Sequence, residues 1–280
     1  MIRWVLLLLF TALITFYSIP VRAQLVGDLG DESKLYAESK QVNQFFRRFN
    51  GEEDEKGNRY YPTDKQYRNN KLRKKYIGIL FDESNAGIGH ALKKEFTENV
   101  LSSSETSILD FHSGNWFAEV NVLLQTNGVD RPATLYMELE KNHLGYKWVI
   151  GKAHADWLDT YFSRDTVRVG RFLHPMSHEL DFMNLRKAFD HSDSISQFTS
   201  KSYQPDHLSV LLYEIKKGNL KFKSVVLMRF HFFQINGWYF ELSDFNRSGY
   251  NTGWLISNLV RLKDDAEKKI MKRYLYHATN

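Results

Sequence analysis

The chain has 280 residues, no cysteine and a formal net charge of +5. A positive excess this small does not indicate a nucleic-acid-binding protein, and a chain without cysteine cannot form disulfides. The fold must therefore rest on a hydrophobic core, for which a content of 42% hydrophobic residues is ample.

The first segment is typical of a secretory signal peptide. Arg3 precedes the apolar run WVLLLLFTALITF (residues 4–16), which is shorter than the roughly 20 residues that a membrane-spanning helix needs. Val21 and Ala23 have the spacing that signal peptidase requires, so we expect cleavage after Ala23 and a mature chain that begins at Gln24. An uncleaved amino-terminal anchor is the alternative. The leader predicts an exported protein, periplasmic or extracellular, with no integral membrane segment after cleavage.

Helical periodicity extends from Ser33 to about Ser103. The segment KLYAESKQVNQFFRRF (residues 34–49) places its apolar side chains at intervals of three, four and seven. A second helix is expected from about Asp64 to Phe81, and IGHALKKEFTENVL (residues 88–101) predicts a third. The polar segment GEEDEKGNRYYPTD (residues 51–64) predicts a solvated loop between the first two helices.

After Ser104 the pattern changes to short apolar runs separated by turns, which is typical of strands. Helices followed by an antiparallel meander of this kind predict an α+β unit. The expected hairpin turn at residues 113–115 would join the first two strands. The four predicted strands are SILDFH (107–112), WFAEVNVLLQT (116–126), ATLYMELEK (133–141) and YKWVIGKAHA (146–155).

The second half of the chain repeats the order of helices and then strands. A polar connector, SRDTVRVGR (residues 163–171), is followed by HELDFMNLRKAFD (178–190) and SISQFT (194–199), which predict helix. Asn236-Gly237 predicts a type I′ hairpin turn, because both central residues of that turn need positive φ. The three strands predicted around it are HLSVLLYEI (207–215), LKFKSVVLMRFHFFQI (220–235) and WYFELSDF (238–245).

The repeated order predicts two domains after the leader at residues 1–23. The first spans residues 24–165 and the second residues 166–280. The segment LKDDAEKKIMKRYLYH (residues 262–277) predicts an amphipathic helix that closes the second domain, with Asp-to-Lys pairs four residues apart.

Helices followed by a strongly curved antiparallel sheet form the cone-shaped fold shared by nuclear transport factor, ketosteroid isomerase and scytalone dehydratase. In FFRRFNGEE (45–53), LDFHSGNWFAEV (109–120) and FLHPMSHELDFMNL (172–185), the chain resembles exported proteins of unknown function from anaerobic gut bacteria. Those proteins look like tandem nuclear-transport-factor-like, or cystatin-like, domains. The resemblance implies an α+β fold of two tandem cone-like units, each with N-terminal helices packed on a curved antiparallel sheet. It implies no activity.

In enzymes with that fold, the sheet and helices enclose an apolar pocket that holds an acid or a His–Asp pair. Asp110 and His112 are the catalytic candidates, since a strand at 109–112 would place both on one face. The aspartate would then fix the tautomer of a general-base imidazole.

The candidates for lining a ligand pocket are Trp116, Tyr136, Glu138 and Trp148. His154 and Asp156 form a further pair with the same spacing as Asp110 and His112. Residues two apart also share the solvent-facing side of ordinary strands. The alternative interpretation of each pair is therefore an ordinary strand surface that faces solvent.

The sequence predicts no metal site and no cofactor. HEL (residues 178–180) lacks the second histidine at i+4 of a zinc-binding helix, and Pro175 separates His174 from His178. The chain also has neither a Gly-x-Ser-x-Gly motif nor a cysteine nucleophile.

Three functional hypotheses follow. The favoured one is an exported, non-catalytic binding or interaction protein, whose partner is a small ligand or an envelope protein. The alternatives are an isomerase- or dehydratase-type enzyme that uses a His–Asp pair in the first cone, and a structural component of an envelope assembly. An enclosed pocket around Asp110 and His112 would favour the enzyme, and a large exposed apolar sheet face would favour the assembly.

Overall fold

The structure is a computed structural model that describes residues 42–54, 56–102, 107–143, 145–159, 173–180, 182–183, 185–190, 195, 198–200, 206–248 and 251–277. The predicted leader and the connector at 163–171 lie outside the described residues. All described residues belong to one compact unit, residues 41–280, and the predicted α+β class is confirmed.

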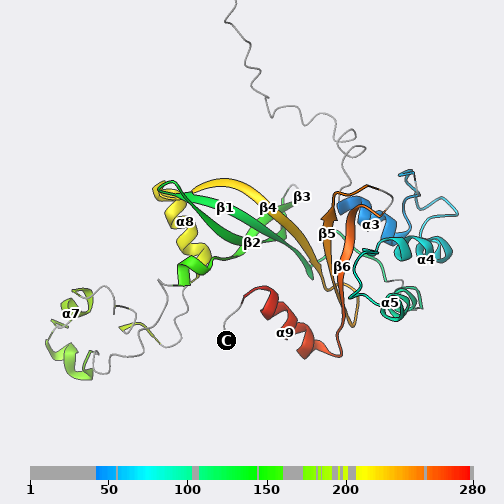
Figure 1. Cartoon of the computed structure of the whole chain (residues 1–280). Helices are drawn as coiled ribbons and strands as arrows, with labels where there is room; N and C mark the ends of the chain where they lie inside the picture. Colours follow the sequence, from blue (N-terminus) through cyan, green and yellow to red (C-terminus); the bar gives the residue numbers. More distant parts are fainter. Residues whose placement is uncertain are drawn as a thin grey trace, which may run out of the picture. The chain divides into compact units, whose positions relative to one another are not determined.

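A six-stranded antiparallel sheet with the order β3-β2-β1-β4-β5-β6 carries the fold (Figure 1). Its two central strands, β1 and β4, pair from Trp116 opposite Phe232 to Gln125 opposite Lys221. The strands of both predicted halves therefore join in one continuous sheet. They are β1 (Trp116–Thr126), β2 (Val129–Asn142), β3 (Gly145–His154), β4 (Lys221–Phe232), β5 (Trp238–Phe245) and β6 (Gly253–Arg261).

The three N-terminal helices and the closing helix are confirmed, as far as their residues are described. The N-terminal helices are α3 (Val42–Asn50), α4 (Asn70–Ile79) and α5 (His90–Ser102), and the closing helix is α9 (Asp265–Leu275). The structure also has α7 (Leu185–Phe189), α8 (His207–Lys217) and two short 3₁₀ helices, η2 (Asp156–Leu158) and η3 (Pro175–Leu180).

The largest core lies between the N-terminal helices and the sheet. Phe45 of α3 contacts Phe232 and Phe240, with ring centroids 6.3 Å from each, and Phe96 of α5 meets the edge of Trp238 at 5.2 Å. Helices of the first predicted domain thus pack on strands of the second, across the boundary predicted between residues 165 and 166.

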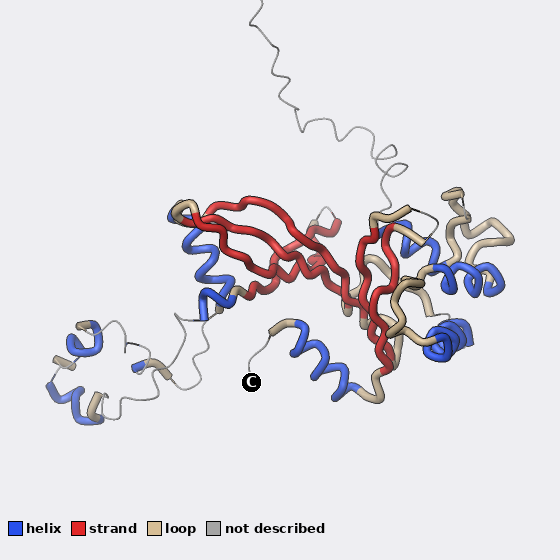
Figure 2. Tube along the Cα trace, in the orientation of Figure 1, coloured by secondary structure: helices blue, strands red, loops and turns tan. Residues whose placement is uncertain are grey.

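A second core forms where α8 packs on the β1–β2–β3 end of the same sheet face. Leu211 of α8 is buried with Val122, Ala133 and Ala153. The two cores share alternate side chains of β1, so the N-terminal helices and α8 cover the same face. Figure 2 shows these helices at opposite ends of the sheet. The other face carries α9, whose Met271 and Leu275 pack against Phe117 and its neighbours.

Residues 207–215, predicted as a strand, form the helix α8 instead, and that prediction is wrong. The carboxylate of Asp206 accepts hydrogen bonds from the backbone N–H groups of Leu208 and Ser209, and Gly218 ends the helix with φ of 78°. A short apolar run fits a strand and a helix equally well, and here the caps at both ends favour the helix.

The predicted strand at residues 107–112 is also wrong, because this segment is a loop that ends in a turn. The side chain of Asn50 provides hydrogen bonds that a neighbouring strand would otherwise supply. It donates to the carbonyl oxygen of Leu109 and accepts from the N–H of the same residue, both at 2.8 Å. The strand β6 was not predicted from the sequence.

The Asn-Gly pair at residues 127–128, in the first half of the chain, forms a type I′ turn. The type I′ turn predicted at residues 236–237 does not form. Asn127 and Gly128 both have positive φ, at 49° and 78°, between the paired residues Thr126 and Val129. At Asn236-Gly237, only Gly237 has positive φ. The β4–β5 connection is longer than a two-residue hairpin, because its last strand pair is Phe232 with Phe240.

Replacing Gly128 with alanine is expected to lower the free energy of unfolding by about 1–2 kcal/mol, because an L-residue is strained at its left-handed φ. Urea unfolding would measure the change. Gly114→Ala is the matched control, since that glycine has no positive φ and its added Cβ meets open space. Equal destabilisation by both substitutions would contradict the assignment of the turn.

Candidate functional site

A hollow of about 740 Å³ lies on the α9 side of the sheet. Glu119, Arg229 and Glu241 line it from β1, β4 and β5, and His154 and His277 border it at the end of β3 and beyond α9. These strand residues alternate with core residues such as Ala118 and Phe230, because successive side chains of a strand point to opposite faces. The hollow is therefore built from the polar positions of otherwise apolar strands.

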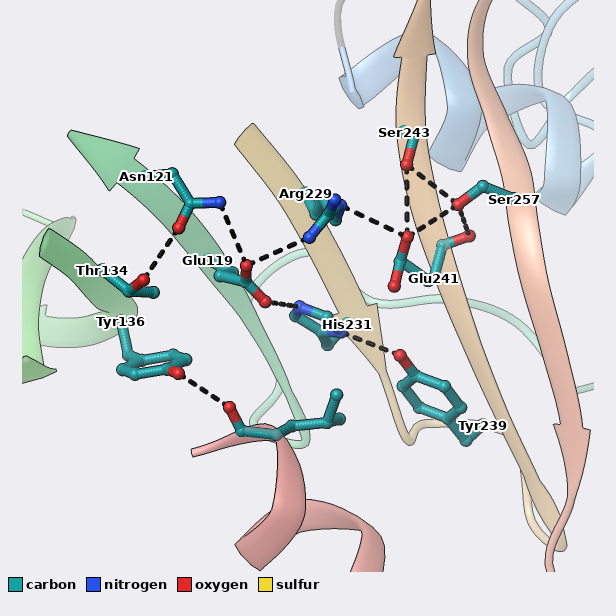
Figure 3. A network of polar contacts seen from close by, with 11 residues as sticks. Glu119, Asn121, Thr134, Tyr136, Arg229, His231, Tyr239, Glu241, Ser243 and Ser257 are labelled. Carbon is teal, nitrogen blue, oxygen red and sulfur yellow. Dashed lines mark hydrogen bonds and ion pairs between the residues drawn. The ribbon is translucent and has the colours of Figure 1, made fainter. Parts of the chain in front are cut away.

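A buried Glu–His–Tyr chain forms the floor of this hollow (Figure 3). Nε2 of His231 lies 3.0 Å from Oε2 of Glu119, and Nδ1 of His231 lies 2.9 Å from the hydroxyl of Tyr239. His231 and Tyr239 are each only 1% exposed. Both ring nitrogens of the buried imidazole therefore have a hydrogen-bond partner, a carboxylate on one side and a hydroxyl on the other.

Arg229 extends the network toward β5. Its Nη1 lies 3.2 Å from Oε1 of Glu119, and its Nε lies 3.6 Å from Oε1 of Glu241. Glu241 also accepts a hydrogen bond from Ser257 at 3.0 Å. One guanidinium thus bridges two carboxylates that stand on different strands.

The network keeps Glu119 ionised and Tyr239 protonated. Burial alone would raise the pKa of Glu119, but the hydrogen bond from His231 and the charges of His231 and Arg229 outweigh it. The pKa of Glu119 is therefore lower than its ordinary value. Burial, with the negative charges of Glu241 and Glu119, raises the pKa of Tyr239. Near neutral pH, Glu119 is therefore ionised and can only accept hydrogen bonds, whereas Tyr239 keeps its proton.

This arrangement favours a structural role over proton transfer. A general base needs a nitrogen lone pair that faces the substrate. Both ring nitrogens of His231 are instead engaged, one by Glu119 and the other by Tyr239. The polar chain joins β1, β4 and β5 within the sheet, and it offers no free imidazole to a molecule in the hollow.

The catalytic candidates Asp110 and His112 are exposed and lie in the loop before β1. Oδ1 of Asp110 accepts a hydrogen bond from the backbone N–H of His112 at 2.9 Å, which caps a turn. The His112 ring packs on Tyr146, with centroids 4.5 Å apart. Within the described part of the chain, no hydrogen bond joins the two side chains into a dyad.

Two of the predicted ligand residues, Trp116 and Trp148, lie on the face of the sheet that the N-terminal helices and α8 cover, opposite α9. Trp116 is buried and stacks on Phe232, with centroids 5.2 Å apart. Trp148 is half-exposed, and its ring meets the Trp116 ring at 5.3 Å. These two residues therefore belong to the rim of the main core.

The other two, Tyr136 and Glu138, lie on the opposite face and hold the end of α9. The hydroxyl of Tyr136 donates to the carbonyl oxygen of Leu275 at 2.7 Å, and the hydroxyl of Tyr276 donates to Glu138 at 2.7 Å. A small hollow of about 240 Å³ borders both Glu138 and Trp116. The four predicted ligand residues do not line a common cavity in the way the sequence analysis expected.

The pair His154 and Asp156 does form, with Nε2 and Oδ1 2.7 Å apart. The His154 ring also stacks on His277 at 4.2 Å and on His207 at 5.2 Å. Burial, together with the charge of His154, lowers the pKa of His277. Among the described residues, no group of three or more His, Cys, Asp or Glu side chains has a geometry that could hold a metal ion.

The residues of the polar chain were missed by the sequence analysis. Glu119 stands among apolar residues in WFAEVNV, and His231 stands between two phenylalanines in RFHFF. A polar residue at an inward position of an apolar strand is a usable signal for burial. The partner of each residue depends on the β1–β4 register, which local sequence does not specify.

The outer edge of β4 is a second candidate site. β1 pairs with β4 along its whole length, whereas β5 pairs only with Arg229–Phe232. No other described strand pairs with Lys221–Met228 on that side. Phe222, Val225 and Val226 are 63%, 54% and 62% exposed along this open edge.

Comparison with protein-family models, with curated proteins and with solved structures finds no match to this chain. In the part of the chain that the structure describes, no helix combines the length and hydrophobicity of a membrane-spanning segment.

Proposed function

We propose that this chain is an exported, non-catalytic interaction protein that binds a protein partner along the open edge of β4. The observation that carries the proposal is the stretch Lys221–Met228, which lacks a strand on its outer side among the described residues and exposes large apolar side chains. An unpaired strand edge presents backbone N–H and C=O groups to another chain. Exposed apolar side chains along the same edge add the hydrophobic contribution that a stable contact needs.

The interior of the molecule supports an interaction role over catalysis. The face of the sheet under α3–α5 is filled by the chain's own aromatic rings, including Phe49, Phe232 and Phe240. The His–Asp dyad of the enzyme hypothesis is not assembled at Asp110 and His112, and His231 has both nitrogens engaged. The His–Asp pair that does form, His154 with Asp156, borders the hollow, but its carboxylate is 92% exposed to solvent.

The finer organisation into two tandem cone-like units, divided at residues 165 and 166, is also a proposal. It is supported by the order of elements, since helices precede strands in each half. Export is supported by the leader pattern at residues 1–23.

The proposed contact is tested by cross-linking the protein in its producing cells and identifying the captured partner by mass spectrometry. Phe222→Thr with Val225→Thr removes exposed apolar surface and keeps residues that favour strands. We expect this variant to bind the identified partner at least about tenfold more weakly, since burial of each side chain contributes about 1–2 kcal/mol.

Tyr61→Thr is the matched control, because Tyr61 is equally exposed but lies in the loop before α4. It should leave the affinity for the partner unchanged. Full affinity in the Phe222 and Val225 variant would show that the edge is not the binding surface.

A further inference from the structure

We propose that the occupant of the open edge is an extended segment of another protein in which apolar and acidic residues alternate, and that it adds to the sheet as a strand beside Lys221–Met228. This inference rests on the proposed function and specifies the chemistry of the partner. Three properties of the edge carry it: its backbone, which no described strand pairs on the outer side, its apolar face and its charge.

The backbone of the edge is ready for strand addition. β4 runs from the α8 end of the sheet to β5, and its β5 partner residues begin only at Arg229, opposite Ser243 (Figure 1). Two bulges interrupt the pairing of Lys221–Met228 with β1, because β4 has one extra residue between Leu227 and Val225 and another between Ser224 and Phe222. Outside the bulges, alternate residues of β4 direct their N–H and C=O groups away from β1. An added strand would satisfy these groups, which is the basis of recognition by β-augmentation.

The partner segment needs apolar residues because of the side chains on one face of the edge. Phe222, Val225 and Met228 pair with alternate β1 residues on the face that α8 covers, and they are 63%, 54% and 37% exposed. Side chains of an added strand on this face would lie directly beside them. The partner segment therefore needs apolar residues at alternate positions.

The acidic requirement comes from the charge around the same edge. Lys221 is exposed at the start of β4, and Lys216 and Lys217 are exposed at the end of α8 just before it. Lys223 is engaged by Asp130, with Nζ and Oδ2 2.6 Å apart. The sequence KFKSVVLMRFHF of β4 contains cations and no acidic residue. Acidic residues of the partner segment, placed between its apolar ones, would be attracted by this positive charge.

The same charges disfavour a second copy of this chain as the occupant. An antiparallel β4 from another molecule would bring a second Lys221 to the seam, together with Lys223 and Arg229, which are already paired with carboxylates. Like charges on opposed strands destabilise the pairing, so a segment of opposite charge fits the edge better.

The test uses the full mature chain and a short fluorescein-labelled peptide of alternating valine and glutamate, with anisotropy as the readout. We expect it to bind, and a valine–lysine peptide of equal length to bind at least about tenfold more weakly. High salt should weaken the binding of the valine–glutamate peptide. Methylation of the peptide nitrogens whose N–H groups would face β4 should abolish its binding, because the added ladder would lose its donors. Lys221→Ala should reduce the salt dependence, whereas Lys74→Ala, an exposed lysine on α4, should not.

Equal binding of the two peptides, or no binding of the valine–glutamate peptide, would overturn the inference. A dimer in sedimentation experiments that Phe222→Thr abolishes would overturn it in favour of a second copy. If the edge variants still lose their natural partner while the peptide fails to bind, the proposed function stands and only the acidic chemistry is wrong. Full binding of the natural partner by the edge variants would overturn both.

Discussion

Replacing Phe232 with alanine is expected to lower the free energy of unfolding by about 3–5 kcal/mol. The Phe232 side chain is fully buried in β4. Its ring stacks on Phe240 of β5 with centroids 4.8 Å apart, on Trp116 of β1 at 5.2 Å, and against Phe46 of α3 at 5.4 Å. The substitution therefore leaves a cavity where three strands and a helix meet.

The measurement is urea unfolding followed by circular dichroism. Phe222→Ala is the matched control, because it makes the same change in the same strand at a residue that is 63% exposed. It should change the stability by less than about 1 kcal/mol. We also expect the helical and sheet signals to be lost together, since α3 and α5 share this core with β4 and β5. A separate, unshifted transition for the helices would contradict this account.

The same core bears on the division of the chain at residues 165 and 166. A fragment of residues 24–165 would keep β1 but lose β4, its long partner, and also the aromatic residues of β5. The two-domain organisation remains a prediction, and the cooperativity of the Phe232→Ala variant is a direct measure of how strongly the halves depend on each other.

Replacing Glu119 with glutamine is expected to lower the free energy of unfolding by about 3 kcal/mol near neutral pH. The substitution removes the negative charge opposite His231 and Arg229, which lie 3.0 Å and 3.2 Å from its oxygens. His231 is 1% exposed, so water cannot compensate for the lost charge.

The effect has a defined dependence on pH. The pKa of Glu119 is lower in the folded protein than its ordinary value, so folding favours the ionised form. Its contribution to stability is therefore present above the pKa of the unfolded chain and is lost as the pH falls through the folded-state pKa. The difference between the wild type and Glu119→Gln should be largest near neutral pH and should shrink in acid.

Urea unfolding of both proteins at neutral and acidic pH would measure this difference. Glu140→Gln is the control, because Glu140 is a half-exposed strand residue whose ion pair with Lys147, at 3.4 Å, is open to solvent. It should change the stability by less than about 0.5 kcal/mol. A stability difference for Glu119→Gln that stays constant from neutral to acidic pH would show that its charge does not stabilise the fold.

Local sequence was sufficient for most elements whose periodicity is regular. The strands 116–126 and 238–245 were predicted with the bounds that the structure shows, and α9 falls within the predicted segment 262–277. Prediction was wrong at residues 107–112 and 207–215. The apolar run there was too short to establish a period, and distant partners or end caps determined the conformation.

The sequence by itself determined the α+β class, the alternation of apolar and polar residues along β1 and β5, and the amphipathic closing helix. These depend on spacings of two to four residues, which a single segment contains. Only the tertiary structure decided that β1 pairs with β4, that Glu119 meets His231, and that β4 extends beyond β5 as an open edge. These contacts join residues about a hundred positions apart, and their register is set by which faces are buried together.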